Sequence, residues 1–393
     1  MRSANPFAPT FGALPPVLAG RADVIGDIAA AWETGPTHPG YTALLLGRRG
    51  TGKTVVLEEL RALAQRQGWL TVSAAAVTPG LLDRLGHAAA EHLNRAAEAL
   101  DADLRGDLAA AGIGIGTAYD PGADLARRLA TVLSVLAEHL DRQGAGMAVT
   151  VDELHAGQTD ELRTLGIALQ DVTRLAQLPM AFVGAGLPVL EDTLLSDESV
   201  TFLQRCGRYE VGFLDHAAAR TALAEPIRQR GGRMSPEAID HAVEAAGGYP
   251  FMVQLVGFHT WEAAAEPDTA VALADVVEGA RAAQQHIGQL VIAPLWRDQP
   301  AAARRFLIAM THDDGESQLT DIARRMDVTS GYVSVYRARL IKSGLVADVG
   351  KRTVAFALPS TRSWIRALDE FSYISESLHL TEERSVGFTL PHD

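Results

Sequence analysis

Short apolar runs and amphipathic segments alternate over the first half of the chain. The apolar runs have the length of strands buried on both faces, and they cover residues 41–46, 69–77, 146–151 and 180–183. The segments with apolar side chains at helical spacing cover residues 24–32, 55–67 and 161–176. Strands that alternate with helices in this way predict an α/β fold, in which helices cover both faces of a parallel sheet.

The second half of the chain has a different pattern. Residues 215–290 read as a series of helices with prolines at the joints. Residues 300–366 contain three helical patterns, followed by two short β-like runs at residues 346–348 and 353–358. Three helices followed by a β-hairpin are typical of a winged helix, which extends the helix-turn-helix motif.

A glycine-rich loop follows the first predicted strand and precedes a predicted helix. It matches the pattern G-x-x-x-x-G-K-[ST], and its residues are Gly47, Arg48, Arg49, Gly50, Thr51, Gly52, Lys53 and Thr54. Glycines let backbone N–H groups turn toward a phosphate without Cβ clashes, and the start of a helix favours an anion. We expect Lys53 to reach the β- and γ-phosphates of ATP or ADP, and the Thr54 hydroxyl to bind Mg²⁺.

Two carboxylates follow the third apolar run directly. We expect Asp152 to bind Mg²⁺ and Glu153 to polarise an attacking water. The run Asp152-Glu153-Leu154-His155 also resembles the D-E-x-H box of helicases. Those helicases need two lobes of this kind, whereas this chain becomes helical after the first. We therefore expect His155 to be a supporting or surface residue.

Composition narrows the class of protein further. The chain has 393 residues, 47% of them hydrophobic, and a formal net charge of −13. This apolar content excludes a wholly disordered chain, and the single cysteine, Cys206, excludes a disulfide framework and reads as an inert apolar filler. No run approaches the roughly 18 apolar residues of a membrane span, and the N-terminus lacks a signal-peptide core. We expect a cytoplasmic protein without membrane contact.

Positive charge is concentrated near the end of the chain, although the whole is acidic. Residues 317–366 contain nine Lys and Arg against three Asp and Glu, a balance of +6. The exposed face of the predicted recognition helix and the tip of the predicted wing carry Ser330, Ser334, Arg337, Arg339, Lys351 and Arg352. Small polar side chains and arginines suit a major groove, and wing-tip cations suit phosphates. We predict contact with double-stranded DNA through residues 317–366, with contact to other proteins as the alternative.

Taken together, these motifs resemble the AAA+ ATPases of the origin-recognition type and their relatives, the STAND-class and archaeal-type ATPases. Three further segments carry the resemblance: residues 18–21 before an amphipathic helix, residues 182–188 at the fourth strand and sensor region, and residues 247–251 in the lid. The resemblance implies that Leu18 lies in a segment that closes over adenine.

The chain departs from the family pattern at two positions. Many relatives carry a polar sensor residue that orients the attacking water, but residues 184–186 read Gly-Ala-Gly. Where others have a sensor arginine in the lid, this chain has Tyr249 and Pro250, as in the STAND-like branch. The resemblance therefore implies that packing of the lid, and not a charge, reports the nucleotide state.

Relatives also carry an arginine that reaches a γ-phosphate, in some of them on the neighbouring subunit. The corresponding segment is residues 202–210, where Arg208 is the first choice and Arg205 the second. The resemblance implies that such a finger stabilises charge on the transferred phosphoryl group, and self-association would follow if the finger acts on a neighbour.

These observations predict five parts, an extended lead-in (1–20), a P-loop ATPase core (21–214), a helical lid (215–298), a winged-helix domain (299–368) and a C-terminal tail (369–393). The expected function is a switch that binds ATP, hydrolyses it to ADP and phosphate, and thereby repositions a winged helix that binds DNA or regulates. The alternative is a nucleotide-gated scaffold for other proteins, with little hydrolysis and no DNA binding. A helicase or other motor would require rings, because only one ATPase core is visible.

Overall fold

The computed structural model describes residues 4–10, 13–77, 79–98, 125–176, 178–193, 201–350, 352–358 and 360–368. The chain divides into two compact units. The N-terminal unit comprises residues 6–226, and the C-terminal unit comprises residues 227–393 together with the first five residues. Among the described helices, none is long and apolar enough to cross a membrane.

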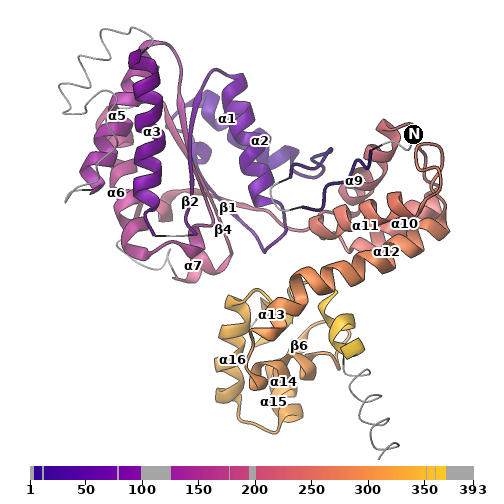
Figure 1. The fold of residues 1–393 in the computed structure, drawn as a ribbon. Coiled ribbons are helices and arrows are strands. Elements are labelled where there is room, and N and C mark those ends of the chain that lie inside the picture. The colour runs from indigo at the N-terminus through magenta and orange to yellow at the C-terminus, as the bar shows by residue number, and fades with distance from the viewer. Residues whose placement is uncertain are drawn as a thin grey trace, which may run out of the picture. The chain divides into compact units, whose positions relative to one another are not determined.

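The N-terminal unit is built on a sheet of five parallel strands in the order β2-β3-β4-β1-β5 (Figure 1). The strands are β1 (Thr42–Leu46), β2 (Leu70–Ala75), β3 (Met147–Asp152), β4 (Met180–Gly186) and β5 (Gly207–Glu210). Its helices and helical turns are α1 (Ala22–Thr34), η1 (Pro39–Tyr41), α2 (Lys53–Arg66), α3 (Leu81–Glu98), α5 (Leu125–Arg142), η2 (Leu154–Ala156), α6 (Thr159–Ala176), α7 (Val189–Thr193) and α8 (Thr201–Arg205). The predicted α/β fold with a parallel sheet is confirmed.

Helices cover both faces of this sheet, and the alternation of side chains along β1 shows how. Leu44 and Leu46 point into a core shared with α3, α5 and α6. Ala43 and Leu45 point to the opposite core, shared with α1 and α2. Because successive side chains of a strand face opposite sides, a strand covered on both faces must be apolar throughout, which explains the unbroken apolar runs.

The apolar runs of the sequence predicted four strands of this sheet, and β5 is the strand that they did not predict. Its four residues, Gly-Arg-Tyr-Glu, are mostly polar, and the strand pairs with β1 alone. An edge strand has one neighbour and exposes part of its length, so a buried apolar run is not required there. The segment 202–210 therefore contains a short helix, α8, and an edge strand.

Strand order brings the predicted motifs to one edge of the sheet. The strands β3, β4 and β1 are neighbours, and all run in the same direction. Their carboxyl ends lead into Asp152, Leu187 and Gly47. In open parallel sheets, ligands bind at this edge.

Helix α9 (His216–Gln229) runs across the division between the two units. The C-terminal unit continues with α10 (Pro236–Ala246), α11 (Pro250–Ala263), α12 (Leu273–Ile287), a π-helical turn η4 (Gly288–Ile292) and α13 (Ala293–Arg297). Helix α10 begins at Ser235, whose hydroxyl accepts a hydrogen bond from Ala238 N–H, and it ends at Gly247 in the left-handed conformation. Asn5 belongs to this unit and donates to the Phe258 carbonyl of α11.

Residues 301–365, which we call the C-terminal module, end in the first part of a helix that covers residues 361–368. Before that helix, they contain three helices and a small antiparallel sheet. They are α14 (Ala301–Met310), β6 (Ser317–Gln318), α15 (Leu319–Met326), α16 (Ser330–Lys342), β7 (Val346–Gly350) and β8 (Thr353–Phe356), with sheet order β6-β8-β7. Phe306, Ile322 and Val333 bring the three helices into one core. The Thr329 hydroxyl caps α16 by accepting a hydrogen bond from Tyr332 N–H.

Candidate nucleotide-binding site

The glycine-rich loop connects β1 to α2, as the motif requires. Gly50 and Gly52 have φ values of +72° and +93°, in the left-handed region that favours glycine. A Cβ atom on Gly47 would lie 2.2 Å from the Val211 carbonyl oxygen, so the chain that follows β5 packs directly on the loop. Both features give the loop a tight turn that brings its backbone close to a ligand.

Lys53 lies across this loop. Its Nζ donates hydrogen bonds of 2.8 Å to the carbonyl oxygens of Gly47 and Arg48, and the residue is 7% exposed. Burial lowers the pKa of Lys53 to about 8, while the nearby carboxylates of Glu153 and Asp152 oppose that shift. An ammonium held inside a ring of backbone groups is placed to exchange a carbonyl acceptor for a phosphate oxygen.

The two arginines of the loop take different positions. Arg48 is half-buried, and its guanidinium lies 5.7 Å from the centre of the Phe213 ring. Arg49 is exposed. Thr51 is buried, and its hydroxyl donates to the Arg48 carbonyl at 2.9 Å, which closes the loop on itself.

The predicted metal-binding residues are in direct contact. Thr54 Oγ1 donates to Asp152 Oδ2 at 2.7 Å, although 98 residues separate them in sequence. The other carboxylate oxygen, Asp152 Oδ1, accepts a hydrogen bond of 2.7 Å from Glu153 N–H. One hydroxyl and one carboxylate fit Mg²⁺, which takes few protein ligands and fills its other positions with water and substrate phosphates. Among the described residues, no cluster of three or more His, Cys, Asp or Glu that could hold a metal is found.

Glu153 occupies an uncommon backbone conformation directly after β3. Its φ is +56°, in the left-handed region that non-glycine residues rarely adopt. Its Oε2 atom lies 3.2 Å from His155 Nε2. Strained backbone of this kind persists where the surrounding structure enforces it, and it is frequent at functional sites.

Arg21 is a further residue of the site, and the sequence patterns did not single out its role. Its guanidinium is buried and donates to the carbonyl oxygens of Thr51 at 2.9 Å and Gly212 at 2.5 Å. It thereby ties the glycine-rich loop to the chain that leaves β5. The sequence did contain one indication of this role, because Arg21 is part of the segment 18–21 that carried the family resemblance.

The predicted arginine fingers lie near β5. Arg208 lies within β5 and forms an ion pair of 3.1 Å with Glu191 of α7. Arg205 ends α8 and is exposed. The residue of β5 that pairs with the last residue of β1, next to the loop, is Glu210. A role for either arginine in phosphoryl transfer stays a prediction.

The residue predicted to contact adenine belongs to the N-terminal unit, and the residues predicted to report the nucleotide state belong to the C-terminal unit. Leu18 is half-buried in the lead-in, and a Cβ atom on the nearby Gly20 would lie 2.8 Å from Ala218 Cβ. Tyr249 is buried at the start of α11, where Pro250 occupies the first helical position. Contact of these side chains with a nucleotide stays a prediction.

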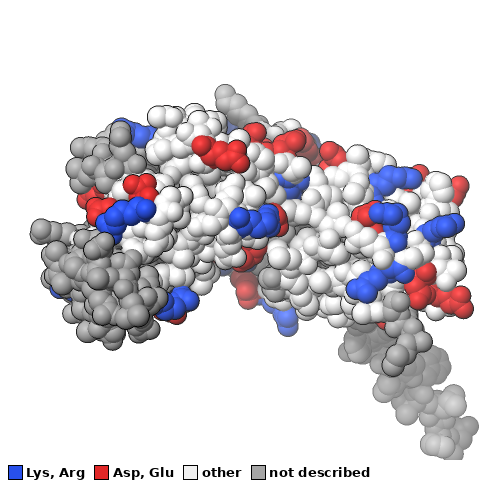
Figure 2. All heavy atoms as spheres, turned by 90° about the horizontal axis from the view of Figure 1, so that it is seen from above, with Lys and Arg blue, Asp and Glu red and all other residues white. Residues whose placement is uncertain are grey.

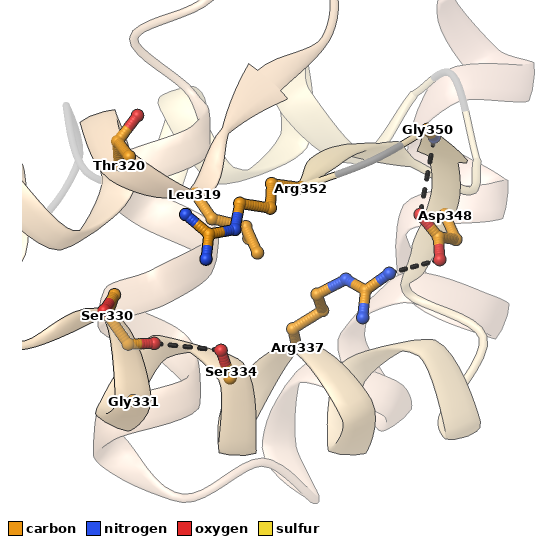
Figure 3. A pocket seen from close by; sticks show the side chains of 9 residues that line it. All are labelled: Leu319, Thr320, Ser330, Gly331, Ser334, Arg337, Asp348, Gly350 and Arg352. Atoms are coloured by element: carbon orange, nitrogen blue, oxygen red, sulfur yellow. Dashed lines mark hydrogen bonds and ion pairs between the residues drawn. The ribbon is translucent and has the colours of Figure 1, made fainter.

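Most of the predicted DNA-binding residues line one groove of the C-terminal module (Figure 3). The groove has a volume of about 530 Å³ and is lined by Ser330, Ser334, Arg337 and Arg352, together with Leu319, Thr320, Gly331, Asp348 and Gly350. The structure thus brings together four of the six predicted residues. Arg339 lies outside the groove lining and donates to Gln299 at 3.3 Å, and Lys351 lies outside the described residues.

The groove is not uniformly basic. Arg337 is paired with Asp348, and Ser334 Oγ donates to the Ser330 carbonyl at 2.9 Å. Arg352 has a φ of +65°, a left-handed conformation at the turn between β7 and β8. Because Arg337 is paired with Asp348, Arg352 and the hydroxyl groups of Thr320 and Ser330 are the groups that the groove offers to a polar ligand.

The fold and the geometry define a P-loop nucleotide-binding protein. Comparison with family models narrows this class: residues 17–183 match the AAA ATPase domain. Residues 289–365 match a domain of unknown function, DUF8462. No curated protein matches the sequence.

Solved structures with the same fold include two archaeal proteins. The Walker-type ATPase of Pyrococcus abyssi is 17% identical, with a TM-score of 0.62, and the match covers 89% of this chain and 96% of that one. The ORC2 protein of Aeropyrum pernix, in ADPNP–ADP complexes, is 13% identical, with a TM-score of 0.60 and coverage of 94% and 98%. The chain therefore shares the overall fold of these two proteins, and its residues 17–183 match the AAA ATPase domain.

We expect Lys53→Ala to lower the affinity for ATP by at least about 100-fold, because charge-assisted hydrogen bonds to phosphate are lost. Isothermal titration calorimetry with Mg-ATP measures the affinity. The exposed Lys342→Ala variant is the matched control and should bind ATP as the wild type does. Unchanged affinity in Lys53→Ala would contradict the assignment of the loop.

We expect Arg21→Ala to destabilise the N-terminal unit by roughly 2–4 kcal/mol, since it leaves two buried carbonyl groups without their charged donor. Urea denaturation followed by tryptophan fluorescence measures this, because Trp32 and Trp69 lie in the same unit. Arg66→Ala, which removes only a surface ion pair with Glu59, should cost no more than about 1 kcal/mol. Equal stability of the two variants would show that Arg21 does not brace the loop.

Proposed function

We propose that the chain is an ATP-dependent switch that binds ATP with Mg²⁺ and hydrolyses it to ADP and phosphate. The contact between Thr54 and Asp152 is the observation that carries this proposal. It joins the end of the glycine-rich loop to the acidic end of β3, so that one hydroxyl and one carboxylate oxygen are close enough to bind the same cation. Lys53 and Glu153 belong to the same edge of the sheet.

Each side chain has a distinct part in this reaction. Thr54 and Asp152 would hold Mg²⁺, which supplies positive charge to the β- and γ-phosphate oxygens. Lys53 neutralises further charge on the same phosphates. Glu153 orients a water and accepts a proton from it as the water oxygen bonds to the γ-phosphorus and the bond to the ADP oxygen breaks.

The matching test of hydrolysis is Glu153→Gln, which keeps the shape of the side chain and removes its basicity. We expect ATP affinity to be unchanged and kcat to fall by about 10²- to 10⁴-fold. Phosphate release under saturating Mg-ATP measures kcat. Wild-type turnover in Glu153→Gln would assign the base to another residue, and a parallel loss of binding would indicate a structural effect.

We further propose that the C-terminal module is a winged helix and that its groove binds duplex DNA. Helix α16 would enter the major groove, and Arg352 at the β7–β8 turn would contact a phosphate. Support comes from the convergence of Ser330, Ser334, Arg337 and Arg352 on one groove. Nucleotide exchange in the N-terminal unit would change the availability of this groove.

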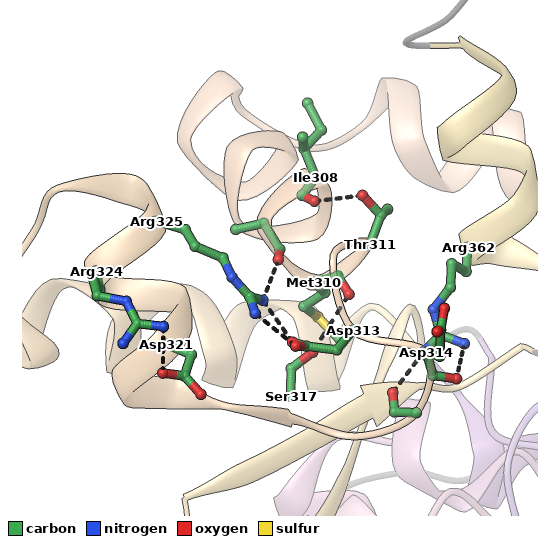
Figure 4. Close-up of polar contacts among 12 residues, drawn as sticks. Ile308, Met310, Thr311, Asp313, Asp314, Ser317, Asp321, Arg324, Arg325 and Arg362 are labelled. Carbon is green, nitrogen blue, oxygen red and sulfur yellow. Dashed lines mark hydrogen bonds and ion pairs between the residues drawn. The ribbon is translucent and has the colours of Figure 1, made fainter.

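A specific observation favours the second candidate, a nucleotide-gated scaffold that binds another protein. The arginines of the module are largely occupied within it: Arg325 makes a bidentate pair with Asp313, and Arg362 donates to the carbonyl oxygens of Asp314 and Gly315 (Figure 4). Asp313, Asp314 and Glu316 lie just before residue 317, and when they are included the balance of +6 falls to +3 for residues 313–366.

The surface seen in Figure 2 agrees with this local neutralisation. In several places on the described part of that face, Lys and Arg side chains lie beside Asp and Glu side chains. Large basic fields are typical of proteins that bind DNA by charge alone, whereas a small groove with few free cations requires shape and hydrogen bonding. DNA binding and the scaffold therefore differ in how binding depends on individual groove residues.

Titration of labelled duplex DNA by fluorescence anisotropy separates the two candidates. If the groove binds DNA, Arg352→Ala should weaken binding and reduce the salt dependence by about one released ion. Asp348→Asn should strengthen binding, because it releases Arg337 from its ion pair. Arg281→Ala on α12 is the control, since its charge is paired with Glu278 outside the module. Negligible binding by all four proteins, the wild type included, would favour the scaffold.

A further inference from the structure

His155 lies between the catalytic carboxylate and the end of β4. Its Nε2 atom is 3.2 Å from Glu153 Oε2, and its Nδ1 atom accepts a hydrogen bond of 3.3 Å from Leu187 N–H. Only 11% of its side chain is exposed. Each ring nitrogen thus lies close to one partner. Glu153 directly follows β3, and Leu187 directly follows β4.

These two contacts fix the tautomer of the ring. Because Leu187 N–H is a donor, Nδ1 must be the acceptor, and the proton of a neutral imidazole then lies on Nε2, the nitrogen that is 3.2 Å from Glu153 Oε2. Burial, together with the positive charges of Lys53 and Arg49, lowers the pKa of His155 to about 4, against the opposing effect of Asp152. The neutral Nε2–H form is therefore the form present at pH 7.

Glycines at the end of β4 lie close to the turn η2. A Cβ atom on Gly184 would be 2.3 Å from Leu154 Cδ1, and one on Gly186 would be 3.6 Å from the His155 backbone nitrogen. A side chain at Gly184 would displace the Leu154 side chain, and Leu154 belongs to the turn η2 that contains His155. The same glycines leave the end of β4 without a polar side chain beside Glu153, so His155 supplies the polar group at this position.

We propose that His155 is a positioning residue for ATP hydrolysis: its Nε2–H holds the Glu153 carboxylate toward the attacking water, and Leu187 N–H holds the ring. This inference rests on the proposed function and adds a residue to it. It also assigns a role to the end of β4, since a shift of Leu187 would move the imidazole and, through it, the carboxylate. The D-E-x-H run thus has a structural meaning here within a single ATPase core.

Amide variants separate the two contacts of the ring. Glutamine places an amide near the Nε2 position and asparagine places one near the Nδ1 position, so His155→Gln should keep most of kcat. His155→Asn and His155→Ala should lose roughly 10- to 100-fold, the range typical of residues that orient a reacting group. ATP affinity should be unchanged in all three. His216→Ala, an exposed histidine at the start of α9, is the control.

A double-mutant cycle tests whether His155 acts through Glu153. In a Glu153→Gln background, His155→Ala should cause no further loss of kcat, because the group that it orients is already inactive. Additive losses, equal kcat in His155→Ala and the wild type, or loss of kcat in His155→Gln as large as in His155→Ala would each overturn the inference.

Nitrogen NMR of histidine-labelled protein provides a readout that needs no turnover. One neutral Nε2–H histidine signal should disappear in His155→Asn and remain in His216→Ala. An Nδ1–H tautomer or a charged ring at pH 7 would overturn the inference even if hydrolysis is normal. Absence of turnover in the wild type would overturn the proposed function, and with it the hydrolytic role of His155, whereas normal turnover in His155→Ala would overturn only the role of His155.

Discussion

The hydrogen bond between Thr54 and Asp152 depends on the order and direction of the strands in the N-terminal unit. The two residues come from α2 and β3, and they meet only because β4 lies between β1 and β3 with all three strands parallel. An antiparallel or differently ordered sheet would send one motif to the opposite edge. The contact is therefore a direct consequence of topology, and the chemistry of the site depends on it.

Tight backbone geometry around this contact comes from a few residues that pack against the loop. Gly47 has no room for a side chain against the Val211 carbonyl, and Arg21 fixes the Thr51 carbonyl from behind. Glu153 accepts a left-handed backbone conformation, which costs of order 1–3 kcal/mol. Burial of the two apolar cores on either side of the sheet offsets this free-energy cost, because apolar burial is the main stabilising contribution to the fold.

The sequence was most informative where structure follows from local periodicity or from a motif with fixed spacing. Strands buried on both faces are unbroken apolar runs, so β1, β3 and β4 could be predicted, and the glycine-rich loop and Asp152 followed from their place after such runs. Strand β5 could not, because an edge strand needs no apolar pattern. The bracing role of Arg21 and the contact between Glu153 and His155 could not be predicted either, since both depend on how distant segments pack.

The charge balance of a sequence segment does not show which of its charges are paired in the fold. The positive balance of residues 317–366 depended on a boundary drawn between Asp313 and its partner Arg325, which meet in space across twelve positions. The pair lowers the pKa of Asp313 to about 2 and leaves both groups ionised, so neither is available to a ligand without separating the other. What a charged residue offers a partner is thus decided by its neighbours in the fold. By that criterion, Arg352 is the groove cation on which DNA recognition would most depend, because Arg337 must first leave Asp348.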